Sequence, residues 1–207
     1  MKSRMKSDAR RASIVNSAIH LFAEKGFRGT TTRELAALLG VTEPVLYQHF
    51  ETKNDLYAAI IEAKAEQGRQ SAAGFLEHLE GSDDRALFTH VAELVLASHE
   101  EDPEFHRLLL FSALERHELA ERFFESQAIC FHEMVTGYIR RRIREGAFRA
   151  VNPRIAAYSF IGMVTQFGLV QVLFGHRPVT VGRKKLIGEI VSIFLNGVAL
   201  PSHGGCQ

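Results

Sequence analysis

Hydrogen-bonding side chains of the kind that contact phosphates gather in one short stretch of this 207-residue chain. Four of them offer hydroxyl or imidazole donors, namely Thr31, Thr32, Tyr47 and His49. Such donors suit phosphate oxygens and fix register on a nucleic acid without reading its sequence. Lys53 adds a cation in the first turn of a predicted helix, where backbone N–H groups already favour an anion. The chemistry that these residue types predict is contact with phosphate groups.

Two short helices must position this stretch. Thr31 and Glu34 form a capping box that opens the first, and Gly40 ends it. Thr42 is placed to cap the second, and Pro44 is tolerated in its first turn because the missing N–H has no partner there.

The spacing at the turn is that of a helix-turn-helix. Ala36 is small enough for the second helix to approach, and Gly40 can adopt the left-handed turn conformation. Val41 and Leu46 are expected to be buried beneath the pair. Such a motif carries its second helix into the major groove of DNA. A generic helical hairpin also places glycine at its turn and is the alternative interpretation.

Charge is spread unevenly along the chain. Residues 1–33 hold eight basic and two acidic side chains, a net charge of +6, whereas residues 57–207 hold 16 basic and 18 acidic, a net charge of −2. A basic head on a mildly acidic body favours a polyanionic partner for the head. A solvated basic arm is the alternative.

In this region the chain resembles the TetR family of bacterial transcriptional repressors. The matching residues are Ala18, Leu21, Phe22, Gly26 and Phe27, then Thr30–Thr32, Leu35, Ala36, Gly40–Thr42, Leu46–Phe50 and Lys53–Leu56. Pro44 is a mild departure, since many members carry glycine there. The resemblance implies a helix-turn-helix DNA-binding domain of three helices, followed by a larger helical domain for ligand binding and dimerisation.

The resemblance further implies that the second short helix faces the groove. The implied base contacts are Thr42, Glu43, Pro44, Val45 and Gln48, and in the family the lysine at position 53 touches phosphate. Gln48 can pair with adenine, Glu43 can accept from cytosine N4, and Val45 can meet a thymine methyl. Structural alternatives are that Thr42 only caps, that Glu43 only complements the helix dipole, and that Tyr47 is half core. Phe27 and Phe50 are interpreted as core.

Helical periodicity runs through the whole chain and predicts an all-α fold of about nine helices. Beyond the two short helices, the expected spans are 8–25, 52–79, 84–101, 103–114, 117–145, 153–174 and 183–200. The expected domains are the DNA-binding domain at residues 1–56 and the ligand-binding and dimerisation domain at residues 57–200. Residues 201–207 lack apolar content and are expected to form a disordered tail.

The last two long helices are expected to form a homodimer, because in the family they pair with their twofold mates as a four-helix bundle. The expected interface residues are Phe160, Phe167, Leu186, Ile190 and Phe194. Residues 156–174 contain no charge and are long enough to span a bilayer. We expect burial in the protein instead, and no membrane partner, because polar residues dilute the segment.

A small hydrophobic effector is the other expected partner. The candidate pocket residues are Phe88, Phe105, Phe111, Phe124, Phe131, Met134, Met163 and Phe167. Apolar stripes of this kind are more often simply core, which is the alternative.

The remaining chemistry points away from an enzyme. No trio of nucleophile, base and orienter, no phosphate-cradling glycine loop and no common helical metal signature is visible, so no catalytic residue, metal or cofactor is expected. A helical metalloprotein or enzyme using residues 99–106, rich in His and Glu, is the rival hypothesis. Two cysteines and no export signal favour the cytoplasm, and Cys130 is expected to be a small buried hydrophobe. The predicted function is a repressor that binds a palindromic double-stranded DNA operator and is released by the effector.

Overall fold

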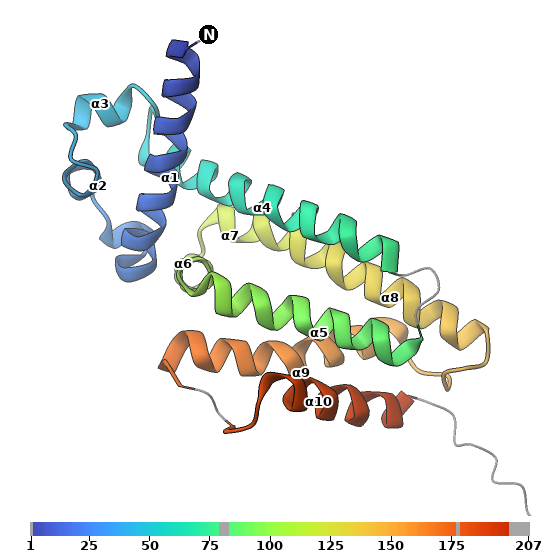
Figure 1. The fold of residues 1–207 in the computed structure, drawn as a ribbon. Helices are drawn as coiled ribbons and strands as arrows, with labels where there is room; N and C mark the ends of the chain where they lie inside the picture. The colour runs from blue at the N-terminus through green and yellow to red at the C-terminus, as the bar shows by residue number, and fades with distance from the viewer. Residues whose placement is uncertain (1, 79–82, 177–178, 199–207) are drawn as a thin grey trace, which may run out of the picture. The chain divides into compact units, whose positions relative to one another are not determined.

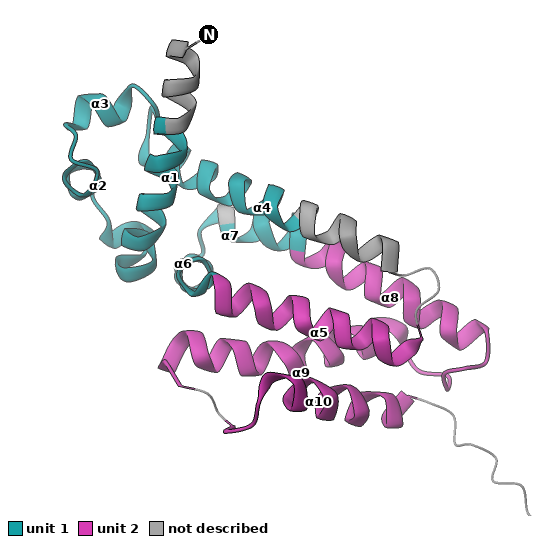
Figure 2. Cartoon of the chain, viewed as in Figure 1, with its two compact units in different colours: residues 1–70, 102–127 teal, residues 71–101, 128–207 magenta. Residues whose placement is uncertain are grey.

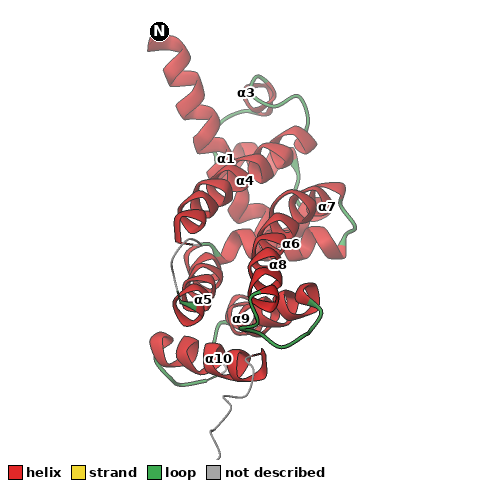
Figure 3. Ribbon diagram, turned by 90° about the vertical axis from the view of Figure 1, so that its right-hand side faces the viewer, coloured by secondary structure: helices red, strands yellow, loops and turns green. Residues whose placement is uncertain are grey.

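The computed structural model describes residues 2–78, 83–176 and 179–198, and every regular element within them is helical (Figures 1 and 3). The α-helices are α1 Lys2–Gly29, α2 Thr32–Leu38, α3 Glu43–Tyr47, α4 Lys53–His78, α5 Asp84–Glu101, α6 Pro103–Leu114, α7 Glu118–Phe123, α8 Ile129–Arg144, α9 Pro153–Phe174 and α10 Arg183–Val198. The all-α prediction is confirmed over this part of the chain. The expected tail at 201–207 and the expected helix ends at residues 79 and 199–200 lie outside the described residues.

The chain divides into two compact units, which Figure 2 colours separately. Unit 1 comprises residues 1–70 and 102–127, and unit 2 comprises residues 71–101 and 128–207. Unit 1 therefore adds α6 and α7 to the N-terminal helices. The division into domains at residues 1–56 and 57–200 follows expected function, whereas the two units follow packing. That functional division stays a prediction.

Unit 1 is built around the apolar stripe of α1. Ile14, Ala18 and Phe22 are almost fully buried, and α1 packs along α6, whose Phe105 and Leu108 belong to the same core. Gly26 interrupts the regular helix with φ +73°, a conformation that a residue with a Cβ adopts only at a cost. The sequence places the end of the first helix at this glycine, and a separate helical turn follows it.

Unit 2 packs α5, α8, α9 and α10 around Phe88. The centroid of its ring lies 4.8 Å from those of both Phe160 and Phe194, and it meets Tyr138 edge to face. Aromatic pairs at such separations contribute attraction beyond the area they bury. The ring of Phe88 therefore joins helices that are distant in the sequence into one core.

Three residues expected at a dimer interface are buried in this core. Phe160, Ile190 and Phe194 are at most 6% exposed, and Phe167 and Leu186 pack partly against them. The apolar stripes of α9 and α10 therefore cover the core of their own unit, and the interface assignment of these residues stays a prediction. The exposed apolar residues of α9 and α10 are Ile155, Leu173, Phe174 and Ile193.

The long helix expected at 117–145 is regular only in parts. A π-helical turn at Phe124–Ala128 separates α7 from α8. Such a turn holds an extra residue and so rotates the helix faces on either side of it. Phe123 before the turn packs on the core of unit 1, whereas Phe131 after it packs on the core of unit 2. The expectation for Cys130 is wrong, since this residue is exposed.

Close packing between α5 and α9 generates a stability prediction. A Cβ added at Gly168 would lie 2.6 Å from Cγ of His99, which is buried and bonds through Nδ1 to the Val95 carbonyl oxygen at 2.8 Å. We expect Gly168→Ala to lower the free energy of unfolding in urea by about 1–3 kcal/mol, because the two helices must separate. Gly137→Ala on α8 is the control, since its added methyl meets nothing within 4 Å. Equal effects of the two variants would contradict this packing argument.

Candidate nucleic-acid interface

A double cap fixes the start of α2. Thr31 Oγ1 accepts from the backbone N–H of Glu34 at 3.2 Å, and the Thr31 N–H donates back to Glu34 Oε2 at 2.9 Å. Lys25 Nζ donates to the same carboxylate at 2.6 Å. The bonds from Lys25 and Thr31 lower the pKa of Glu34 to about 2. The capping box predicted from sequence is confirmed.

The turn between α2 and α3 has helix-turn-helix geometry. Gly40 adopts φ +63°, and the Val41 N–H donates to the Ala36 carbonyl at 3.0 Å. Leu46 is buried beneath the pair, as the spacing predicts, whereas Val41, also expected to be buried, is only half-buried; Ala36 is buried at the contact. The short helix α3 is thereby held against α2 and presents its other side outward.

The five residues proposed to read bases line α3 and its start. Thr42, Pro44 and Gln48 are exposed, and Glu43 and Val45 are half-buried. The Thr42 side chain makes no capping bond, so the hydroxyl is not used as a cap here. Thr32 Oγ1 donates to Glu43 Oε2 at 2.8 Å, and this bond connects α2 to α3. It does not use the second carboxylate oxygen of Glu43. The base-contact assignments stay predictions.

Four of the five proposed phosphate residues are accessible on the same two helices and their ends. Thr31 and Tyr47 are exposed, and Thr32 and His49 are half-buried. The hydroxyl of Tyr47 lies 3.5 Å from Thr32 Oγ1, so the two hydroxyls sit together. The Tyr47 hydroxyl donates to Thr32 Oγ1, which itself donates to Glu43 Oε2, so either hydroxyl donates to a phosphate oxygen only after its O–H turns away from that partner.

Lys53 is held differently from the others. Its Nζ donates to the carbonyl oxygens of Phe27 at 2.7 Å and Thr30 at 2.8 Å, and lies 4.2 Å from the centroid of the Phe27 ring. Burial lowers the pKa of Lys53. Two of its three N–H donors are therefore used to close the turn after α1, and one remains for a phosphate.

Residues from the corner between α6 and α7 hold the other side of the same turn. Glu115 accepts from the backbone N–H of Phe27 at 3.1 Å and from that of Arg28 at 3.3 Å. The ring centroid of His117 lies 4.3 Å from that of Phe27, and burial lowers the pKa of His117. Arg116 between them has φ +53°, a strained conformation for a non-glycine residue.

Sequence reasoning missed Glu115 and His117. Each lies nearly ninety positions from the turn it contacts, with a separation of 88 for Glu115 and Phe27. Neither has a local pattern that indicates such a contact. Only the packing of α6 along α1 brings the corner to the turn.

The candidate pocket residues fall into both units and form no single cavity within either. Phe105 and Phe111 lie in unit 1 with Phe124, which is 50% exposed, whereas Phe88 is fully buried in unit 2. The remaining four, Phe131, Met134, Met163 and Phe167, pack partly on the unit 2 core. Phe167 also lines a cavity of about 20 Å³ in unit 2, which is the size of a water site and not of an effector.

The histidine-rich region at 99–106 is taken up by structural contacts. Asp102 caps α6 through the Phe105 N–H and pairs with Lys64 at 2.5 Å. Glu100 pairs with Arg183 at 2.7 Å. Across the described residues, no group of three or more His, Cys, Asp or Glu side chains is arranged to hold a metal ion.

Comparison with protein families agrees with this geometry. Residues 14–60 match the model for bacterial regulatory proteins of the tetR family, and residues 88–197 match that for the C-terminal domain of AefR-like transcriptional repressors. The chain belongs to the TetR family. It is a DNA-binding transcriptional regulator with the all-helical fold of that family.

Named relatives cover most of this TetR-family chain. The nucleoid occlusion factor SlmA of Marinobacter nauticus is 31% identical over 72% of this chain and 74% of its own length. The repressor KstR2 of Rhodococcus jostii is 27% identical over 94% of this chain and 93% of its own. The crystal structure of AibR with isovaleryl coenzyme A and operator DNA is 20% identical, covers 89% of this chain and 97% of its own, and has a TM-score of 0.64.

Lys53 gives the prediction of this section, because its contacts are internal. We expect Lys53→Ala to lower the free energy of unfolding without DNA by about 1–2 kcal/mol, since two carbonyls lose a charged donor. Lys185→Ala, at an exposed position on α10, is the control for loss of one positive charge. Urea titration of both variants makes the comparison. If Lys53→Ala leaves the free energy of unfolding unchanged, the internal bonds of Lys53 do not stabilise the fold, and phosphate contact is the one role left for this lysine.

Proposed function

We propose that this regulator is a repressor that binds a palindromic operator as a homodimer and releases it when a small hydrophobic effector binds. It acts in the cytoplasm and catalyses no reaction. The observation that carries the DNA-binding part is the exposure of Pro44 on α3 and of Thr42 and Gln48 at its two ends, with a helix-turn-helix turn at Gly40, where φ is +63°. These exposed positions suit direct reading of base edges in the major groove.

The homodimer is supported by exposed apolar side chains on α9 and α10. Ile155, Phe174 and Ile193 are each more than 60% exposed, although both helices supply core residues to unit 2. α9 is also apolar enough over Pro153–Phe174 to meet the length and composition of a membrane span. A second copy covering this face removes the exposed apolar surface and supplies the twofold axis that a palindrome mirrors.

The effector is supported by relatives rather than by a formed pocket. The AibR structure holds isovaleryl coenzyme A beside operator DNA, and the R. jostii relative is a transcriptional repressor. By linkage, an effector that weakens operator binding must itself bind less tightly when operator is present. A hundredfold release requires about 2.7 kcal/mol of differential affinity. Titration of isovaleryl coenzyme A with and without operator is the first test, and equal affinities would argue against this compound as effector.

Gln48 tests the assignment of base reading. On a duplex that the wild type selects from a random-sequence pool, we expect Gln48→Ala to relax preference at one base position per half-site by about 1–3 kcal/mol. His49→Ala is the comparison, and we expect it to weaken binding similarly on selected and random duplexes, because phosphate contacts carry no sequence information. Uniform losses for both variants would contradict this division of roles. Failure of the wild type to select any sequence would contradict the operator proposal.

Ile193 and Ile190 form a matched pair for testing the dimer. They lie on the same helix, but Ile193 is 63% exposed and Ile190 is 5% exposed. We expect Ile193→Glu to give folded monomers in sedimentation, because a charge is introduced into the intersubunit face. We expect Ile190→Glu to unfold unit 2, because it places a charge in a core without a partner. A dimeric Ile193→Glu protein would place the interface elsewhere.

A further inference from the structure

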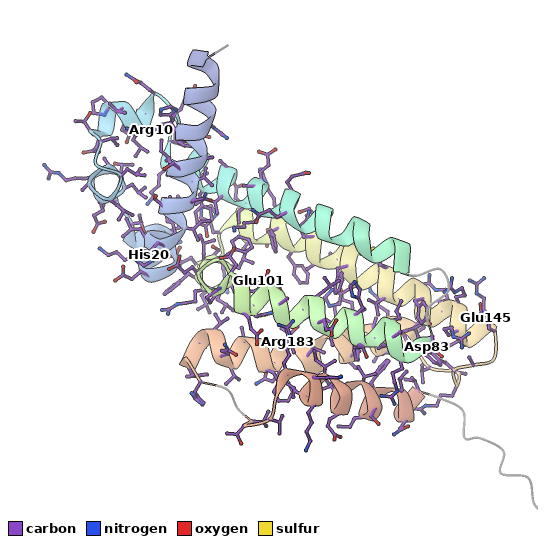
Figure 4. The ribbon with its side chains drawn as sticks, in the orientation of Figure 1. Arg10, His20, Asp83, Glu101, Glu145 and Arg183 are labelled. Carbon is purple, nitrogen blue, oxygen red and sulfur yellow. The ribbon has the colours of Figure 1, made fainter. Side chains whose placement is uncertain are left out.

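Arg11 stacks on an aromatic ring next to the proposed DNA-contacting residues. Its guanidinium carbon lies 4.8 Å from the centroid of the Phe50 ring. Phe50 is 3% exposed, whereas Arg11 is exposed on α1. The ring therefore holds the cation at the surface, and Figure 4 labels the preceding residue, Arg10, on the same part of α1.

Stacking leaves the hydrogen-bonding edge of the guanidinium unused. A guanidinium over a ring is attracted through its charge, and this attraction uses none of its five N–H donors in a hydrogen bond. Among the described residues, no carboxylate pairs with Arg11, in contrast to Arg142 with Asp84 and Arg183 with Glu100. Its charge and donors are thus available to an external anion.

The position of the ring indicates which anion. Phe50 directly follows His49 and lies three residues after Tyr47 and three before Lys53. Three of the five proposed phosphate contacts therefore flank the ring on which Arg11 rests. Lys53 already uses two of its three donors on backbone carbonyls, whereas Arg11 beside the same ring makes no ion pair with a carboxylate among the described residues.

We propose that Arg11 binds a DNA backbone phosphate beside those reached from residues 47–53, with Phe50 as the residue that positions it. The proposal rests on the DNA-binding function of the chain and adds a residue from α1 to the interface. A planar guanidinium can donate two parallel bonds to one phosphate, which a lysine cannot do. Holding the group on a ring before DNA arrives reduces the side-chain entropy lost on binding.

The test measures binding to a random-sequence duplex over a range of salt concentrations, because a phosphate contact does not depend on sequence. We expect Arg11→Gln to weaken binding about tenfold per protomer at low salt. The slope of log affinity against log salt should decrease in magnitude by about 0.9 per protomer. Arg107→Gln is the matched control, since this arginine is exposed on α6 of the same unit and its loss changes the net charge equally.

Two further variants separate direct contact from a general effect of charge. Arg11→Lys should keep the salt slope but lose part of the affinity, because the charge remains while the paired planar donors are gone. In a Phe50→Leu background, Arg11→Gln should have a smaller effect than in the wild type. If Phe50→Leu does not fold, Arg11→Lys alone makes the distinction.

Equal effects of Arg11→Gln and Arg107→Gln on affinity and salt slope would overturn the proposal. So would an Arg11→Lys protein indistinguishable from Arg11→Gln in salt slope. These outcomes are independent of the operator. A wild type that selects no sequence from a pool contradicts the repressor function, whereas the salt slope on random duplex still decides the role of Arg11.

Discussion

The turn from Gly26 to Thr30 is the constraint on which the DNA-binding unit depends. Gly26 permits the chain to leave α1 with a positive φ, and the turn is then held from both ends. Glu115 accepts from its N–H groups and Lys53 donates to its carbonyl oxygens. A negative charge at the N–H end and a positive charge at the carbonyl end both complement the dipole of a helical turn. Since α2 begins immediately afterwards, the position of the helix-turn-helix follows from this turn.

The short helices α2 and α3 need such support because helices of seven and five residues are not stable alone. Their stability comes from caps, from the bond between Thr32 and Glu43, and from the burial of Leu35 and Leu46. With one face occupied by these contacts, the opposite face stays exposed. The exposure of Gln48 and its neighbours is thus a consequence of how the two helices are packed.

Unit 2 shows how one apolar helix can serve two surfaces. α9 contributes Phe160 and Val164 to a core centred on Phe88, yet leaves Ile155 and Phe174 exposed. The absence of charge over residues 156–174 is therefore explained only in part by the core of its own unit. A face that remains apolar on a surface is unfavourable in water, which is why the proposed dimer uses the residues next to the buried stripe.

Local signals in the sequence determined most helices and the family. Capping residues and glycines at turns act over three or four positions, so Thr31–Glu34, Gly26 and Gly40 could be interpreted without a structure. Periodicity gave the all-α class and the bounds of α5, α6 and α9 correctly. It could not separate a stripe that faces the core from one that faces a partner, because both are apolar, and the structure buries Phe160, Ile190 and Phe194 in the core of their own unit. Three contacts could be found only from the tertiary structure: the bonds from the turn to Glu115, the Phe50 ring beside Arg11, and the bonds of Lys53 to backbone carbonyls. They join residues between 23 and 88 positions apart, which no local pattern connects.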